Sequence, residues 1–363
     1  MSDSIFEQFF RLLQESGPVN WRLAEEILKT MIGPGEPLDP RLTEEYRELA
    51  VAAQLLLDSS LPLSVPKSDL HPVDAKTWAQ ENQQSFRYLI EPLAGKMSFG
   101  GGDAASADPM AAMLQPLGPA LLGMQAGSMV GAMSQQILGQ FDGGLPPADS
   151  DRMYLVVPNV ERFATEHNLD AQQVRMWAAM HEVAYHAVLE VDWVRPRFAQ
   201  LVDEFYETLQ FDPSRLTDAL GSMEDPMALQ EMLGGPSAMS DLMGATHDIA
   251  SLDAVQAFAA FIEGYTDYAV GTVAGSRLPQ LERIAEAHHR RRTESADADQ
   301  TFTQFTGLEL QRHRAKDAAE FCDEVQHRWG EDALPRIWEQ ADRTPTLAEL
   351  TDPVGWAARV LLD

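Results

Sequence analysis

Residues 109–141 contain no charged side chain, and this stretch limits the folds that are open to the chain. Gly123, Gly127 and Gly131 recur within it every four residues, a spacing that in a membrane favours close packing of two helices. Two prolines interrupt the run, however, and glutamines and serines are spread through it, which suits a protein interior better than lipid. We therefore expect a buried helix whose glycine face admits a neighbour, and no membrane insertion.

The charge balance argues against nucleic acid as a partner. Acidic residues outnumber basic residues 56 to 27, the formal net charge is −29, and only five residues are lysines. Such a surface repels phosphate-rich ligands. The one basic run, HHRRR at 288–292, is followed by acidic residues, and we interpret it as a solvated helix end.

Cysteine usage and the first residues indicate the compartment. Cys322 is the only cysteine, so an intrachain disulfide and a cysteine-rich metal site are excluded. The opening MSDSIFEQFFRLLQESG has neither the basic start nor the long apolar run of a secretion signal. We expect a cytoplasmic protein, and the sequence leaves its oligomeric state open.

The chain divides by composition into three parts. We predict a helical N-terminal region at 1–95, a Gly/Ala/Met-rich segment with the buried helix at 96–150, and a main domain at 151–363, together one compact unit. The apolar, β-branched stretch 152–160 predicts a strand that ends at a proline. Residues 211–250 predict only short helical pieces that cover a cleft or form a surface excursion.

Three local signals fix helix ends. Asp170 is a predicted N-cap for a helix over 171–190. Near the end, Thr346 and Glu349 have the spacing of a capping box, and Asp352 before a proline predicts the start of the last helix. The fold class that follows is mainly α with a minor β element.

The helix predicted over 171–190 contains MHEVAYH, which nearly matches the zinc-peptidase motif H-E-x-x-H. In that motif two histidines four residues apart bind zinc and the glutamate acts as general base. His181 and Glu182 are present, but Tyr185 stands at the second histidine position and His186 comes one residue late. The motif is therefore incomplete by one ligand.

A structural interpretation of this helix needs no metal. His181 and Tyr185 lie on the apolar stripe, where they act as a hydrogen-bonded core histidine and a packing tyrosine. Glu182 and His186 lie about 100° further round, where they form an exposed i,i+4 pair. His186 could replace the missing ligand only if a π-bulge added one residue to the turn.

A second helical stretch, FIEGYTDYAV, favours a site over simple packing. Glu263 and Asp267 lie four apart within an apolar stripe, and buried carboxylates are costly unless they are paired or bind a metal. Glu263 suits a third metal ligand, and Asp267 suits a carboxylate that orients a ligating histidine. We expect this helix to lie beside the helix over 171–190, with His181 facing Glu263 or Asp267.

Six stretches together resemble a bacterial zincin-like family of uncharacterised hydrolases, of the Zincin-2 type, one branch of which is associated with deazaflavin-coenzyme biosynthesis. They run in order along the chain and are GMQAGSMVGAMSQQILGQFD, YLVVPNVERF, WAAMHEVAYHAVLEVDWVRPRF, FIEGYTDYAV, GLELQRHRAKDAAEFCDEV and RTPTLAELTDPVGWAARV. The resemblance implies a mainly helical zincin-like metallopeptidase fold with the motif helix at its centre. It also implies zinc as cofactor, with His181 as first ligand, Glu182 as general base and Glu263 as third ligand.

The sequence departs from the family pattern at Tyr185, where the second histidine belongs. A phenol is a poor zinc ligand because it ionises only near pH 10, so the site has fewer good ligands than the usual three. We predict a zincin-like protein with a degraded motif, weakly active or non-catalytic, that binds a peptide or protein ligand. The alternatives are an active zinc metallopeptidase completed by Tyr185 or His186, and an unrelated helical protein. A strand before the motif helix slightly favours a peptide ligand, since an extended peptide can pair with it.

Overall fold

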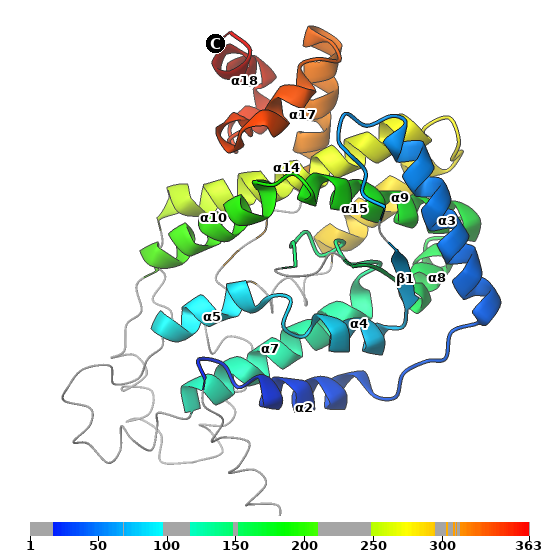
Figure 1. Cartoon of the computed structure of the whole chain (residues 1–363), viewed down its shortest axis with the longest axis vertical. Coiled ribbons are helices and arrows are strands. Elements are labelled where there is room, and N and C mark those ends of the chain that lie inside the picture. The colour runs from blue at the N-terminus through cyan, green and yellow to red at the C-terminus, as the bar shows by residue number, and fades with distance from the viewer. Residues whose placement is uncertain are drawn as a thin grey trace, which may run out of the picture.

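The computed structural model describes residues 17–67, 69–96, 117–147, 152–209, 248–294 and 313–362, together with residues 303, 308 and 310. These residues are mainly helical, with one small sheet of two parallel strands (Figure 1). The predicted fold class, mainly α with a minor β element, is confirmed. The predictions for residues 1–16, for the break after residue 96 and for 211–247 lie outside the described residues.

The first half of the chain forms five helices and one strand among the described residues: α2 (Trp21–Ile32), α3 (Pro40–Asp58), β1 (Leu70–Val73), α4 (Ala75–Asn82), α5 (Arg87–Lys96) and α7 (Leu117–Gln136). The second half contains the other strand and the longer helices: β2 (Met153–Val156), α8 (Val157–Glu166), α9 (Ala171–Leu189), α10 (Val194–Thr208), α14 (Ile249–Ala274), α15 (Leu281–Glu294), α17 (Arg314–Trp329) and α18 (Pro353–Val360). Short 3-10 helices join α17 to α18: η2 (Leu334–Glu339), η3 (Ala341–Arg343) and η4 (Glu349–Thr351).

The predicted helix ends are confirmed by their capping bonds. The Asp170 side chain accepts a hydrogen bond from Gln173 N at the start of α9, and Asp352 accepts from Gly355 N at the start of α18. In the capping box, Glu349 N donates to Thr346 Oγ1 at 3.3 Å and Thr346 N donates to Glu349 Oε2 at 2.9 Å. These bonds satisfy N–H groups that a helix start leaves without partners.

The glycine face of α7 packs against α2, as the uncharged stretch predicts. A Cβ on Gly123 would lie 2.2 Å from Asn20 O, and one on Gly127 would lie 2.4 Å from Ala24 O. Only glycine lets the two backbones approach this closely. In Figure 1 both helices lie side by side at the bottom of the view. In the described part of the chain, no helix has the length and apolar character needed to span a membrane.

The sheet has two short strands, and both edges of β2 are hydrogen-bonded. β2 pairs in parallel with β1, in the register Leu70 with Met153 and Val73 with Val156. On its other side, Val156 N donates to Leu138 O at 2.8 Å, and Gln140 N donates to Tyr154 O at 3.0 Å. An extended peptide therefore cannot pair with β2, contrary to the expectation that favoured a peptide ligand.

The predicted strand, expected to end at the proline of the stretch 152–160, is β2 and is slightly shorter than expected. It ends at Val156, because Pro158 lies in the first turn of α8 and the chain becomes helical at Val157. Proline is tolerated in a first helical turn, where its missing N–H costs nothing.

Helix α9 is the element around which the others gather. It packs against α3, α8, α10, α14, α15 and β2, and in Figure 1 it lies in the upper layer with α14 and α15. One hydrophobic core includes buried residues from Val19 to Val360. The three-part division at 95 and 150 stays a prediction.

Candidate metal centre

Helix α9 carries the motif through the protein interior, and every residue from Trp177 to Leu189 is buried. The prediction that Glu182 and His186 form an exposed pair is wrong, because these residues are only 2% and 1% exposed. The loop after α7 covers this face, and Phe141 stacks on His186 with ring centroids 6.0 Å apart. Both polar side chains are therefore held where they need specific partners.

Three potential metal ligands meet where α9 packs against α14. His181 Nε2 lies 3.4 Å from Glu263 Oε1 and 3.7 Å from Asp267 Oδ1. One ligand atom from each of the three residues lies within 4.8 Å of the others. Glu263 and Asp267 are one turn apart on α14 and so face α9 together. The predicted approach of the carboxylates to His181 is confirmed, and we call these three residues the donor cluster.

Burial controls the protonation of the donor cluster. Desolvation lowers the pKa of His181, although Asp267 opposes the change, so the imidazole is neutral at pH 7. A neutral imidazole is the form that binds a metal. Burial raises the pKa of Asp267 to about 6 against the opposing effect of His181. That side chain is 35% exposed, and its contact with water limits the shift.

Glu182, the predicted general base, lies against the loop that follows α7. Phe141 N donates to its two carboxylate oxygens at 3.2 and 3.3 Å. Gly139 packs directly on the carboxylate, since a Cβ there would lie 2.3 Å from Glu182 Oε1. Burial raises the pKa of Glu182 well above its ordinary value, although the Phe141 N–H opposes the shift. A raised carboxyl pKa is the property that a general base near neutral pH requires.

Tyr185 is fully buried, and an aromatic stack holds its ring. The ring lies parallel to Phe141, with an interplanar angle of 6° and centroids 5.0 Å apart. The centroid of the His181 ring is 6.4 Å away. Tyr185 thus shares a helix face with His181, as predicted, and packs as a core residue there.

His186 lies outside the donor cluster. Helix α9 is a regular α-helix throughout, so the π-bulge that would turn His186 toward the donor cluster is not present. Its Nε2 lies 3.4 Å from Glu190 Oε1, one turn further along the same helix. The group of donors found among the described residues does not include His186.

Helix α15 brings buried basic residues to the donor cluster, where the sequence did not predict them. The interpretation of 288–292 as a solvated helix end is wrong for His288 and Arg292, which are 3% and 9% exposed, although Arg290 is exposed. α15 packs against α9 and α14, and this contact turns His288 and Arg292 inward. The run itself gave no such signal, since its acidic partners Asp142 and Glu263 are distant in the sequence.

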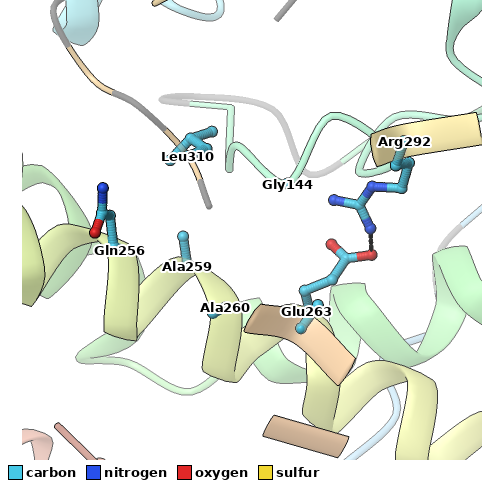
Figure 2. A pocket seen from close by; sticks show the side chains of 8 residues that line it. Gly144, Gln256, Ala259, Ala260, Glu263, Arg292 and Leu310 are labelled. Atoms are coloured by element: carbon cyan, nitrogen blue, oxygen red, sulfur yellow. Dashed lines mark ion pairs between the residues drawn. The ribbon is translucent and has the colours of Figure 1, made fainter. Parts of the chain in front are cut away.

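Arg292 forms an ion pair with Glu263 inside the protein (Figure 2). The guanidinium group approaches Oε1, the same oxygen that lies closest to His181 Nε2. Both residues line a cavity of about 20 Å³, together with Gln256 and Gly144. This volume holds about one water molecule.

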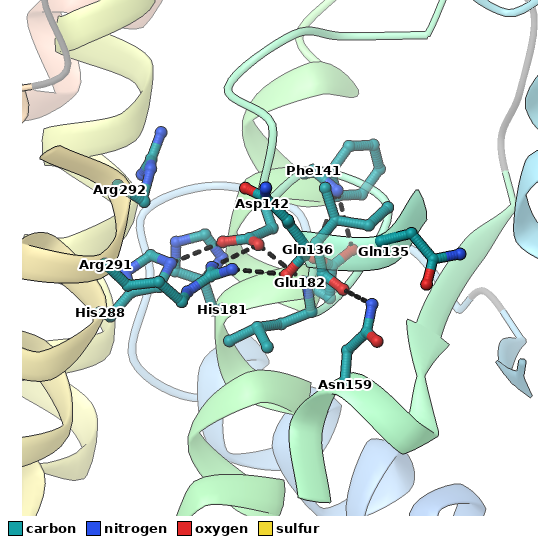
Figure 3. A network of polar contacts seen from close by, with 12 residues as sticks. Gln135, Gln136, Phe141, Asp142, Asn159, His181, Glu182, His288, Arg291 and Arg292 are labelled. Carbon is teal, nitrogen blue, oxygen red and sulfur yellow. Dashed lines mark hydrogen bonds and ion pairs between the residues drawn. The ribbon is translucent and has the colours of Figure 1, made fainter. Parts of the chain in front are cut away.

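Asp142 links the loop after α7 to α15 (Figure 3). His288 Nε2 lies 2.6 Å from Asp142 Oδ1, Arg291 Nη2 lies 2.6 Å from Oδ2, and Leu138 N donates to Oδ2 at 2.8 Å. Burial alone would raise the pKa of Asp142, but the Arg291 guanidinium and His288 hold it well below its ordinary value. Burial lowers the pKa of His288 to about 4 despite its hydrogen bond. The network therefore joins a carboxylate, a guanidinium and a neutral imidazole.

The donor cluster has features that favour a zinc ion and features that oppose one. In favour, His181 Nε2 is buried and forms no hydrogen bond among the described residues, and imidazole and carboxylate are usual zinc ligands. Against it, the Arg292 guanidinium already neutralises Glu263, and the second histidine position holds the stacked Tyr185. As folded, the site does not fit zinc, and no chemical step through zinc follows from this geometry.

A buried H-E pair on a central helix, with two carboxylates facing it from a later helix, defines a zincin-like arrangement. The sequence pattern of the zincin-like metallopeptidase family matches residues 19–357, and the chain belongs to this family.

Among solved structures, the chain is similar to "a putative hydrolase with a novel fold" from Chloroflexus aurantiacus. The match has a TM-score of 0.67 and 21% sequence identity, and covers 95% of this chain and 99% of the other. At this identity the likeness shows the fold alone. No curated protein matches the chain significantly.

Proposed function

We propose that this chain is a zincin-like protein that carries little zinc, has little or no peptidase activity, and binds a peptide or protein ligand. The observation that carries the proposal is the state of position 185. A tyrosine ring stacked on Phe141 stands where the motif needs an imidazole. A phenol binds zinc well only when ionised, and tyrosine ionises near pH 10.

The space at the donor cluster supports the same proposal. The cavity beside Glu263 and Arg292, about 20 Å³ in volume, has room for a water molecule but not for a peptide. A groove of about 500 Å³ lies between α10, α14 and residues 341–348, and offers room for a ligand side chain. A peptide in this groove could not extend to a hydrolytic centre by adding a strand to β2, because both edges of β2 are already hydrogen-bonded.

Zinc content tests the proposal. The natural chain and the Tyr185→His variant are loaded with zinc, dialysed identically and measured by elemental analysis. We expect well under one zinc per natural chain, and a higher content in the variant, because a histidine restores the second ligand. Tyr206→His is the matched control, since Tyr206 is a buried tyrosine outside the donor cluster. One zinc per natural chain would refute the proposal.

A second candidate function is an active zinc metallopeptidase. The three donors within 4.8 Å of one another favour it, as does the raised pKa of Glu182. In that case His181 and Glu263 would hold zinc with Tyr185, since His186 lies outside the donor cluster, and the role of the zinc would be to acidify a bound water. Glu182 would then accept the proton. Peptidase activity that rises in proportion to bound zinc and is lost in Glu182→Gln would favour this candidate. The association with deazaflavin-coenzyme biosynthesis stays a prediction from the sequence resemblance.

A further inference from the structure

We propose that the Arg292 guanidinium is the resident cation of the donor cluster, and that Arg292 and a divalent metal ion bind Glu263 in mutually exclusive ways. The inference rests on the proposed function, in which the natural chain carries little zinc. The missing histidine at position 185 is one reason for a low zinc content. The inference adds a second reason and assigns it to a residue on another helix.

The first support is geometric. His181 Nε2 and the Arg292 guanidinium both approach Glu263 Oε1. A metal held jointly by His181 and Glu263 would need this same oxygen, because it is the carboxylate atom that faces the imidazole. In Figure 2 the Arg292 side chain extends from α15 to the Glu263 carboxylate along the cavity. The guanidinium therefore lies where the metal and its ligand would meet.

The second support is the balance of buried charge. Arg291 pairs with Asp142, and Arg292 pairs with Glu263, so each cation already has its carboxylate. Adding a dication to Glu263 and an ionised Asp267 while Arg292 stays would leave one uncompensated positive charge. Unpaired charge in a protein interior is strongly unfavourable. With Arg292 removed, the two carboxylates and a dication balance.

The third support is the state of His181. Its Nε2 is buried and accepts or donates no hydrogen bond among the described residues, and the residue is 3% exposed. A buried polar atom usually has a partner. A nitrogen held 3.4 Å from Glu263 Oε1 without a hydrogen bond is what remains when a metal ligand keeps its place and the neighbouring cation pairs with the carboxylate. The Arg292 guanidinium offers N–H donors to the carboxylate but, unlike a metal ion, does not coordinate the imidazole nitrogen.

The test is the affinity for Zn²⁺ alone, measured by competition with a chelating dye on the full-length chain. Arg292→Gln removes the cation, and we expect it to bind Zn²⁺ at least tenfold more tightly than the natural chain. Arg290→Gln is the matched control, because it makes the same charge change at an exposed neighbour, and we expect no change. Equal affinity in the two variants would overturn the inference.

A further variant guards against misfolding and identifies the donor. Glu263→Gln with Arg292→Gln removes both charges of the pair, so we expect it to fold without metal and to show no tenfold gain. A gain in this double variant would overturn the assignment of Glu263. If Arg292→Gln alone unfolds without metal, Zn²⁺ should restore its circular dichroism, and failure to do so would also overturn the inference. Stoichiometric zinc in the natural chain would refute the proposed function, whereas the ratio between Arg292→Gln and Arg290→Gln would still decide the role of Arg292.

Discussion

Alanine at Gly127 tests whether close backbone contact holds α2 on α7. A Cβ there would lie 2.4 Å from Ala24 O and 3.0 Å from Ala24 Cα, roughly 1 Å short of van der Waals contact. Both partners are helix backbone, so neither can move aside as a flexible side chain would. Overpacking of this kind costs about 1 to 3 kcal/mol, and replacing glycine by alanine within a helix returns about 0.5 to 1 kcal/mol. We expect the free energy of unfolding to fall by up to about 2.5 kcal/mol net.

Gly271 provides the matched control for this substitution. It also lies within a helix, α14, but a Cβ there would meet nothing within 4 Å. Only the helix-forming term then applies, so Gly271→Ala should raise the free energy of unfolding by about 0.5 to 1 kcal/mol. Urea denaturation followed by circular dichroism measures both variants. Equal stability of the two alanine variants would refute the packing of α2 on the glycine face.

Two further predictions concern the buried network around Asp142. Asp142→Asn keeps the volume but leaves the Arg291 guanidinium without its carboxylate, so we expect a loss of about 3 kcal/mol in the free energy of unfolding by urea denaturation; a loss under 1 kcal/mol would contradict the pairing. His288 has a folded pKa of about 4 against an ordinary value of 6.5, so below pH 6.5 the unfolded chain takes up a proton that the folded chain does not, and stability falls as the pH falls toward 4. Between pH 7 and pH 5 this contributes about 2 kcal/mol, which His288→Gln should remove; an unchanged difference between the two pH values would contradict a neutral His288.

Much of the motif region could be predicted because its signals are local. The 3.6-residue period puts His181 on the inner face of its helix, and the same period puts Glu263 and Asp267 together on another. Polar side chains on the buried faces of two helices need partners, and this requirement alone predicts that the three donors meet. The cap at Asp170 is likewise a signal contained within four residues.

The parts that could not be predicted depend on contacts between distant segments. Strand β1, Leu70–Val73, is four residues long and contains a proline, so its sequence alone does not predict a strand. It becomes a strand by pairing with β2. The basic run 288–292 has the composition of a solvated surface, and its burial depends on Asp142 and Glu263. Charge patterns within one helix cannot reveal a counter-ion that another helix supplies.

The parallel pairing of β1 with β2 has a consequence for synthesis on the ribosome. About 80 residues separate the end of β1 from the start of β2, and a similar length of chain separates α2 from α7. Closing loops of this length costs conformational entropy before any contact stabilises the pair. At about 5 to 20 residues per second, translation takes roughly 4 to 16 seconds to deliver the partner strand. During that interval the apolar faces of α2 and β1 are surfaces for chaperones to cover, because the segments that will bury them have not yet been made.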